Sequence, residues 1–251
     1  MEKVAAYRLL LSVLDLTTLE GKDTNERVVE LCNQAKSYAA KGLPNTAAVC
    51  FYPPFAALAK QQLKASGIHV ACVAGAFPSG QSPLEVRLAE VRYAVENGAD
   101  EIDMVISRGK FLEGDFEFVA KEVREHKKAC GEAHLKVILE TGELQTEDNI
   151  RKASEIAIEN GADFIKTSTG KISPAATLEA FTIMCEVIKA HYETTGKMIG
   201  IKPAGGISEP EDALKYLLIL ENILGEKWMN NNYFRIGASR LANKLEAVLT
   251  Q

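Results

Sequence analysis

The segment Asn160-Gly161-Ala162-Asp163-Phe164-Ile165-Lys166 decides the fold, because it repeats an earlier one, Asn97-Gly98-Ala99-Asp100-Glu101-Ile102-Asp103. Each copy joins an Asn-Gly helix stop to the start of a strand. The copies are 63 residues apart, about twice the ~31 residues per unit expected when ~250 residues form eight βα units. The repeat therefore predicts two strands separated by a third, with Asp103 and Lys166 in one interior layer of a barrel. The alternative is a chance recurrence of a common helix-stop phrase.

The rest of the chain alternates in the same way between short apolar segments and longer amphipathic ones. The predicted strands are Ser12–Leu16, Thr46–Tyr52, His69–Ala76, Glu101–Ile106, His134–Glu140, Phe164–Ser168, Met198–Lys202 and Tyr233–Gly237. The predicted helices include Thr24–Ala40, Pro83–Asn97, Phe116–Cys130, Glu147–Asn160, Ala176–His191 and Glu209–Leu224, with starts at Asp23-Thr24 and Ser173-Pro174. Eight strands, each followed by a helix, indicate an α/β protein, a (β/α)8 TIM barrel with an extra N-terminal helix. We expect one domain over residues 1–251.

Composition and charge limit the possible binding partners and the cellular compartment of the protein. The chain has 47% hydrophobic and 25% charged residues and a formal net charge of −5, which argues against nucleic acid or an anionic membrane as a partner. Its five cysteines are odd in number and form no C-x-x-C pair, which favours a reducing, cytoplasmic location. The four histidines show no ligand spacing, so no metal site is expected.

Three lysines interrupt consecutive predicted strands: Lys136, Lys166 and Lys202. Parallel strands covered on both faces normally read as continuous apolar runs, and lysine is rarely buried unless it is paired. One interpretation is an interior ion network in which Asp15, Asp103 and Glu140 neutralise the lysines, although such pairs add little stability over apolar packing. This interpretation competes most strongly for Lys136.

The other interpretation is amine catalysis. A lysine attacks a carbonyl only as the neutral amine, and desolvation or a neighbouring cation favours that form. We therefore predict Lys166 as the nucleophile, Lys202 as the cation beside it, and Asp103 as the group that exchanges protons with the substrate. Asp15, at the end of its strand, and Lys136 are candidates for a supporting role.

Three loops that carry Gly or Ser follow the last three predicted strands. They are Thr167–Lys171, Pro203–Gly206 and Gly237–Arg240, the region where such barrels commonly bind phosphate. Ordinary βα turns are the alternative. The candidate phosphate-binding residues are Thr169, Gly170, Lys171, Gly205, Gly206, Gly237 and Ser239. Cys50, near the end of its strand, is interpreted first as a packed core residue and second as a thiol near the pocket.

Several of these phrases resemble the deoxyribose-phosphate aldolase (DeoC) family. They include Glu140–Leu144, Gly161–Lys171, Lys202–Gly206, Leu14–Leu19, Asn45–Cys50, Gly98–Asp103 and Arg235–Ser239, and the likeness runs from about Leu10 to Ala247. The resemblance implies reversible cleavage of 2-deoxy-D-ribose 5-phosphate into acetaldehyde and D-glyceraldehyde 3-phosphate, with no metal or organic cofactor. It also implies that Lys166 forms the Schiff base, that Lys202 and Asp103 share the proton relay, and that a homodimer is a reasonable expectation.

The sequence departs from the best-known bacterial members at two places. Arg240 stands where they carry a second serine, and the sequence ends at Val248–Gln251 without their terminal tyrosine, from which we expect slower proton exchange at the donor carbon. Other functions stay open on sequence alone. They are a Schiff-base aldolase for a ketose phosphate, a phosphosugar isomerase or epimerase, and a non-enzymatic sugar-phosphate sensor.

Overall fold

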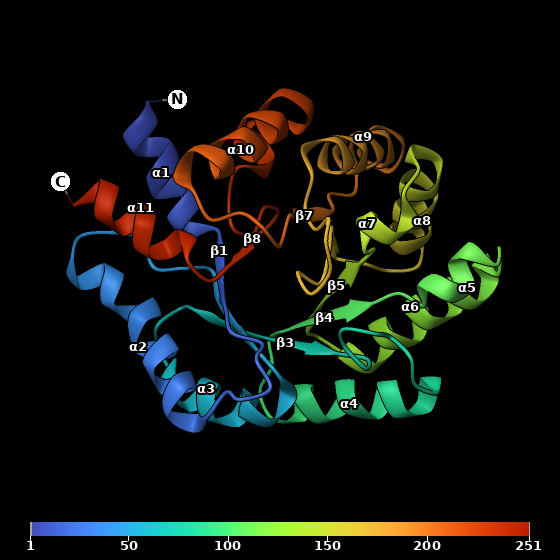
Figure 1. Ribbon diagram of the computed structural model, residues 1–251, viewed down its shortest axis with the longest axis horizontal. Helices are drawn as coiled ribbons and strands as arrows, with labels where there is room; N and C mark the ends of the chain where they lie inside the picture. Colours follow the sequence, from blue (N-terminus) through green and yellow to red (C-terminus); the bar gives the residue numbers. More distant parts are fainter. Residues whose placement is uncertain (1, 251) are drawn as a thin grey trace.

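Eight parallel strands form the centre of the molecule in a computed structural model that describes residues 2–250. They are β1 (Leu14–Thr17), β2 (Ala48–Phe51), β3 (His69–Ala74), β4 (Glu101–Val105), β5 (His134–Ile138), β6 (Phe164–Lys166), β7 (Gly200–Lys202) and β8 (Ile236–Ala238). Each strand from β1 to β6 pairs with the next in the chain, and β1 also pairs with β8. Two parallel bridges, Ile201 with Phe234 and Ala204 with Gly237, close the ring between β7 and β8. The predicted barrel is confirmed (Figure 1).

A helix follows every strand and lies outside the ring (Figure 1). The main helices are α2 (Asn25–Ala40), α3 (Ala56–Gln62), α4 (Leu84–Glu96), α6 (Phe116–Cys130), α8 (Glu147–Glu159), α9 (Leu178–Thr195), α10 (Pro210–Leu224) and α11 (Leu241–Leu249). Short segments supplement them, namely η1 (Pro53–Phe55), α5 (Arg108–Leu112), α7 (Thr141–Leu144) and η2 (Glu226–Trp228). The extra N-terminal helix α1 (Lys3–Ser12) packs against α10 and α11. Within residues 2–250 we find no helix with the length and apolar character needed to cross a membrane.

Two kinds of boundary differ from the sequence prediction. Most strands end earlier than predicted; β6, for example, stops at Lys166, and Thr167 and Ser168 begin the following loop. The helix predicted to start at Ser173-Pro174 starts instead at Leu178, because the hydroxyl of Thr177 accepts the N–H of Ala180 and caps it. The C-terminal position at which the family tyrosine is missing, Gln251, lies outside the described residues.

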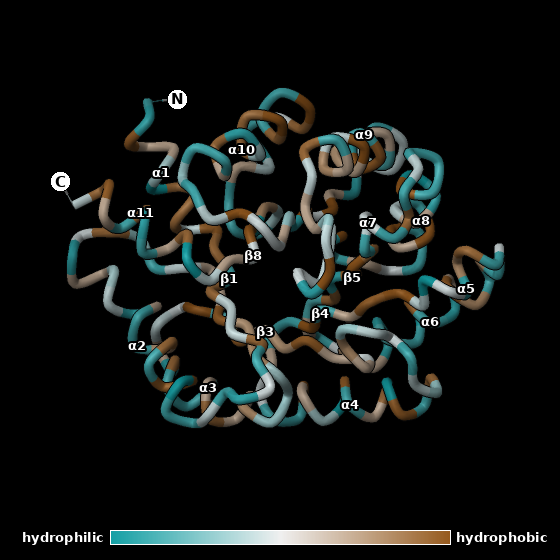
Figure 2. The backbone as a smooth tube through the Cα atoms, in the orientation of Figure 1, coloured by the Kyte–Doolittle hydropathy of each residue, from teal (hydrophilic) through white to brown (hydrophobic). Residues whose placement is uncertain are grey.

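The apolar core has two parts. The larger one lies between the strands and the helices, and the helices turn their hydrophobic faces toward it (Figure 2). The smaller one lies inside the barrel and contains Ala48, Cys50, Ala71, Val73, Val105 and Ile138. Alternate strand residues point inward, so the positions around this small cluster are filled by the charged side chains described next. At the amino end the ring of Phe164 occupies the space beside Gly200, where a Cβ would lie 2.3 Å from it.

Candidate active site

The barrel interior holds a continuous cluster of buried charges. Asp103 is at its centre: its Oδ1 accepts a hydrogen bond from Lys136 Nζ (2.9 Å), and its Oδ2 accepts from Lys166 Nζ (2.8 Å) and Lys202 Nζ (2.7 Å). Lys202 also contacts Asp15 Oδ2 at 2.5 Å. All five side chains are at most 4% exposed.

This geometry confirms the layer predicted from the sequence repeat. Asp103 and Lys166 come from equivalent places on β4 and β6, and their side chains meet directly across the intervening strand. Lys136, on β5 between them, is paired in register with Asp103. The strand register therefore brings one carboxylate within reach of three lysines.

Two of the three carboxylates predicted to pair with the lysines, Asp15 and Asp103, belong to the cluster, and the third does not. Glu140 lies outside it: its carboxylate accepts the N–H of Thr169 (3.1 Å) and the Thr169 hydroxyl (2.6 Å). Glu101 takes its place, 2.5 Å from Lys136 Nζ. Arg235 was also missed; it donates to Asp15 Oδ1 (2.8 Å) and to both oxygens of Glu101. Both residues stand two positions before a candidate site residue on a predicted strand, which places them on the same inward face.

The charges of the cluster do not balance when every lysine is protonated. Three carboxylates, those of Asp15, Glu101 and Asp103, face four cationic groups, those of Lys136, Lys166, Lys202 and Arg235. One amine is therefore in excess, and an unpaired buried charge is costly.

The surroundings select Lys166 as that amine. Burial lowers the pKa of Lys166; Asp103 opposes the shift, but Lys202 adds to it, and the net pKa falls below its ordinary value. For Lys136 and Lys202, burial also acts to lower the pKa, but the neighbouring carboxylates outweigh it and raise both values. Burial acts to raise the pKa of Asp103, yet the three lysines hold it well below its usual range. Lys166 is thus the lysine that most readily becomes a neutral amine.

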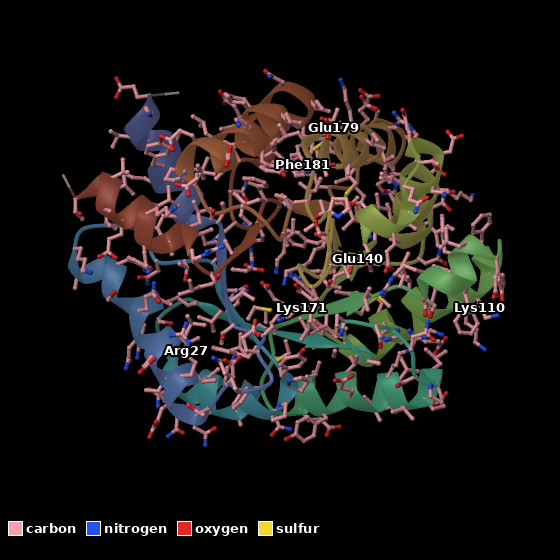
Figure 3. The ribbon with its side chains drawn as sticks, in the orientation of Figure 1. Arg27, Lys110, Glu140, Lys171, Glu179 and Phe181 are labelled. Atoms are coloured by element: carbon pink, nitrogen blue, oxygen red, sulfur yellow. The ribbon has the colours of Figure 1, made fainter. Side chains whose placement is uncertain are left out.

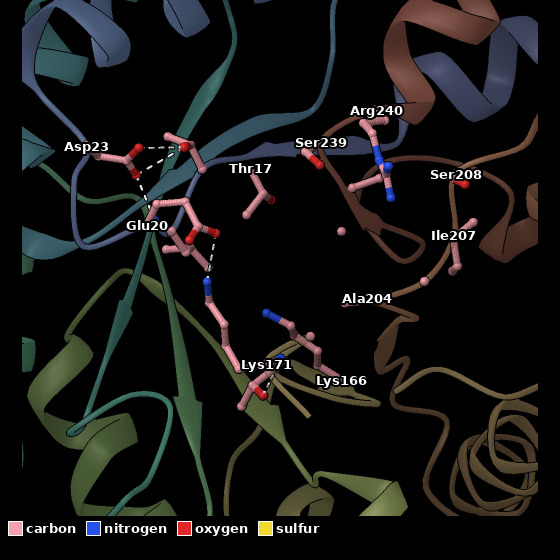
Figure 4. Close-up of a pocket in the computed structure, with 18 of the residues that line it drawn as sticks. Thr17, Glu20, Asp23, Lys166, Lys171, Ala204, Ile207, Ser208, Ser239 and Arg240 are labelled. Atoms are coloured by element: carbon pink, nitrogen blue, oxygen red, sulfur yellow. Dashed lines mark hydrogen bonds and ion pairs between the residues drawn. The ribbon is translucent and has the colours of Figure 1, made fainter. Parts of the chain in front are cut away.

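Lys166 also faces open space. A cavity of about 560 Å³ lies at the carboxyl ends of the strands, and of the three strand lysines Lys166 is the one among its described lining residues. Figure 4 shows the Lys166 amine pointing into this cavity, with Ser239 and Arg240 across from it. Lys136, Lys202, Asp103 and Asp15 lie beneath, inside the barrel.

The three predicted phosphate loops line the other side of the same cavity. Thr169, Gly170, Lys171, Gly205, Gly206, Gly237 and Ser239 are all among the lining residues. The loops after β6 and β7 pack backbone to backbone, because a Cβ on Gly205 would lie 2.9 Å from the Cα of Gly170. Gly206 has a φ of 83° and nothing within 4 Å of where a Cβ would be, so its backbone is open to a ligand.

The two cationic side chains of these loops are placed differently. Lys171 crosses the cavity mouth and donates to Glu20 Oε1 at 2.9 Å (Figure 4). Figure 3 places Lys171 and Glu140 at the central opening, whereas Lys110 and Glu179 lie on the outer helices. Arg240 lines the cavity beside Ser239, immediately before α11 begins at Leu241. Arg240 therefore faces the cavity and not the solvent alone.

The end of β1, the first turn of α2 and the loop between them contribute cavity residues that were not predicted from the sequence. Thr17, Thr18, Glu20, Asp23 and Arg27 line the cavity next to the phosphate loops. Asp23 fixes this loop by accepting the Thr18 hydroxyl (2.9 Å) and the Glu20 N–H (2.9 Å). The signal available was position alone, since the loop follows the first strand and must reach the same face as the loop after the eighth.

Cys50 and metal ligation are the two remaining candidates. Cys50 is fully buried in the inner core, and burial, with a smaller contribution from Asp103, raises the pKa of its thiol to about 11. It is a neutral packed residue beneath the cavity. Over residues 2–250, no group of three or more His, Cys, Asp or Glu side chains is arranged to hold a metal ion.

Fold and site together define a (β/α)8-barrel enzyme that presents an amine to a cavity at the carboxyl ends of its strands. The family model described as "DeoC/LacD family aldolase" matches residues 9–218. The chain belongs to this family of aldolases.

Curated and solved relatives agree with this assignment. The chain is 47% identical to the human deoxyribose-phosphate aldolase, over 93% of this chain and 77% of the relative. It is also 47% identical to a putative deoxyribose-phosphate aldolase of Caenorhabditis elegans, over 93% of this chain and 78% of that one. A crystal structure of a putative deoxyribose-phosphate aldolase from Toxoplasma gondii superposes with a TM-score of 0.87 at 27% identity, covering 98% of this chain and 95% of that one.

Proposed function

We propose that this enzyme reversibly cleaves 2-deoxy-D-ribose 5-phosphate to acetaldehyde and D-glyceraldehyde 3-phosphate through a Schiff base on Lys166. The observation that carries the proposal is the excess amine: three buried carboxylates serve four cationic groups, and the group in excess faces the cavity. The names of the curated relatives support the choice of substrate.

The chemistry follows from the positions of three groups. The neutral Lys166 amine attacks the aldehyde carbon, and loss of water leaves an iminium that withdraws electrons from the neighbouring carbon. Removal of the proton from the C3 hydroxyl then breaks the C2–C3 bond and releases glyceraldehyde 3-phosphate. The remaining enamine takes up a proton at C2, and hydrolysis returns acetaldehyde and the free amine. Asp103 and Lys202, 2.7 Å apart, are placed to pass these protons, directly or through water.

The phosphate group occupies the opposite end of the cavity in this proposal. The backbone at Gly206, the hydroxyl of Ser239 and the guanidinium of Arg240 line that end, and α11 begins there with its free N–H groups. Backbone N–H groups and an arginine are the donors that phosphate oxygens prefer.

Arg240→Ala should raise the KM for 2-deoxyribose 5-phosphate by about 10- to 100-fold and leave kcat within about twofold, because a charge-assisted hydrogen bond contributes ~1.5–3 kcal/mol. Steady-state kinetics measure both constants. Lys244→Ala on the same helix, where the lysine is paired with Glu209 outside the cavity, is the matched control. An unchanged KM for Arg240→Ala would remove this residue from the phosphate site.

Borohydride trapping tests the covalent mechanism. Reduction in the presence of 2-deoxyribose 5-phosphate should leave a stable adduct on the peptide that contains Lys166, detected by mass spectrometry. Lys189→Leu, which removes an exposed lysine of α9, should give the same adduct. Binding of the sugar phosphate with no adduct would exclude the Schiff base and leave an isomerase or a sensor to account for the cavity.

A further inference from the structure

An exposed imidazole is connected to the buried cluster from the end of the barrel opposite the cavity. His69 is the first residue of β3, and its side chain is 46% exposed. Its Nδ1 lies 2.7 Å from Glu101 Oε1, and Glu101 is fully buried. The proposed mechanism gives His69 no role.

The contact continues without a break to the reactive amine. Glu101 Oε2 lies 2.5 Å from Lys136 Nζ, which lies 2.9 Å from Asp103 Oδ1. Asp103 Oδ2 in turn lies 2.8 Å from Lys166 Nζ. Three interposed side chains, all at most 1% exposed, therefore link an exposed histidine at the amino end to an amine in the cavity at the carboxyl end.

The alternation of β3 explains why a histidine reaches this cluster. Ala71 and Val73 belong to the inner core, and His69 is two positions before Ala71, so its side chain lies on the same inward face. At the amino end of the barrel, this face borders both solvent and Glu101. The position is thus the one place on β3 where a side chain can touch the cluster and water together.

We propose that His69 is a positioning residue for Lys166. The charge state of the His69 imidazole sets how strongly Asp103 holds the Lys166 proton. When the imidazole is protonated, it competes with Lys136 for the Glu101 carboxylate. Lys136 then interacts more strongly with Asp103. The Asp103 carboxylate therefore stabilises the protonated form of Lys166 less, and the Lys166 ammonium loses its proton more easily. The proposal rests on Lys166 being the reactive amine of the proposed function.

The groups around His69 determine when it becomes charged. The hydrogen bond to Glu101 is the largest influence and raises the pKa of His69; burial and Arg235 oppose it, and Asp100 adds to the rise. Lys60, which is paired with Asp100, and Lys64 and Glu96 line the surface hollow next to the imidazole. With its pKa above the ordinary value, His69 is protonated on the acid side of neutrality and loses its proton as the pH rises through that pKa.

The effect should therefore appear only at low pH. As the pH falls, Lys166 tends to become protonated, and the simultaneous charge on His69 opposes this. His69→Gln removes the opposition, so its kcat/KM at about pH 6 should be about threefold below that of the wild type and equal to it at about pH 9. His69→Arg, a permanent cation, should keep at least the wild-type value at both pH values.

Competitive labelling of the substrate-free protein with trace acetic anhydride, read at the Lys166 peptide across pH, measures the fraction of neutral amine without using the reaction. His69→Gln should move the Lys166 labelling curve to higher pH and His69→Arg should not. His134→Gln is the matched control, because His134 is an exposed first strand residue paired in register with Glu101. Superimposable curves for wild type and His69→Gln, or an equal displacement in His134→Gln, would overturn the proposal. A missing borohydride adduct with a displaced labelling curve would instead remove the aldolase mechanism and retain the coupling.

Discussion

Lys166→Leu should lower kcat by about 10⁴-fold or more and yet leave the protein as stable as the wild type to within about 1 kcal/mol. The kinetic loss follows from the removal of the only amine of the three strand lysines that faces the cavity, because a covalent nucleophile has no substitute. The stability follows from the charge count. Without Lys166, the carboxylates of Asp15, Glu101 and Asp103 still face three cations, those of Lys136, Lys202 and Arg235.

Lys136→Leu is the matched control, because a protonated Lys166 can restore the charge count but, from its place beside Asp103, does not replace the contact of Lys136 with Glu101. Both substitutions place leucine in the same interior cluster, but Lys136 contacts Glu101 at 2.5 Å and Asp103 at 2.9 Å, and its removal leaves Glu101 with Arg235 and His69. Breaking such a buried pair typically costs ~3–5 kcal/mol. Denaturant unfolding of both variants measures the difference. Equal losses of stability would contradict the assignment of Lys166 as the excess charge, and residual activity near the wild-type level would exclude it as the nucleophile.

The charged layer inside the barrel could be predicted from the sequence. Charged residues on predicted parallel strands are exceptional, and the repeat around Asp103 and Lys166 predicts that these two side chains lie in one layer of the barrel. Two regular periods were sufficient: the alternation of faces along a strand and the spacing of βα units. The contact at 2.8 Å between these side chains confirms that Asp103 and Lys166 lie in the same layer.

The carboxylate that pairs with each lysine was harder to predict. Which carboxylate a lysine contacts depends on how far the side chains extend across neighbouring strands, and not on their order in the chain. Glu140 lies two residues beyond the end of β5, and its backbone adopts a left-handed conformation with a φ of 57°, which is rare for a residue other than glycine. This turns its carboxylate toward Thr169 in the next loop. Lys136 is contacted instead by Glu101, which is paired in register with His134 and lies one layer below Asp103.

Loop boundaries were predicted least well for a related reason. Thr167 and Ser168 have the composition of a strand end, but their hydroxyls bond to Ala204 in the neighbouring loop. The Thr167 hydroxyl accepts the Ala204 N–H at 3.0 Å, and the Ser168 hydroxyl donates to the Ala204 carbonyl at 2.5 Å. These contacts form between loops that are 36 residues apart or more, so local sequence patterns carry little information about them.

Lys202→Met should reduce kcat/KM at neutral pH by about 10³-fold and shift the remaining activity to higher pH. In the wild type, Lys202 shares Asp103 Oδ2 with Lys166 and lies 2.7 Å from it. Without this ammonium, Oδ2 serves Lys166 alone, and the pKa of Lys166, which burial and Lys202 keep low, must rise. Lys166 then replaces Lys202 as the third cation, which keeps the cluster neutral and the protein folded but occupies the lone pair that catalysis needs.

The sign of the pH effect separates two roles of Lys202. A raised pKa of Lys166 means that less of it is neutral at a given pH, so activity should recover in part as the pH increases. If Lys202 acted only as a proton donor, the rate would fall by the same factor at every pH and the profile would keep its shape. Lys171→Met is the control: Lys171 lines the same cavity, but it is paired with Glu20 at the mouth, so its loss should leave the acid side of the profile unchanged. Recovery at high pH in Lys202→Met, measured from the pH dependence of kcat/KM and from Lys166 labelling, would therefore show that one lysine keeps the other uncharged.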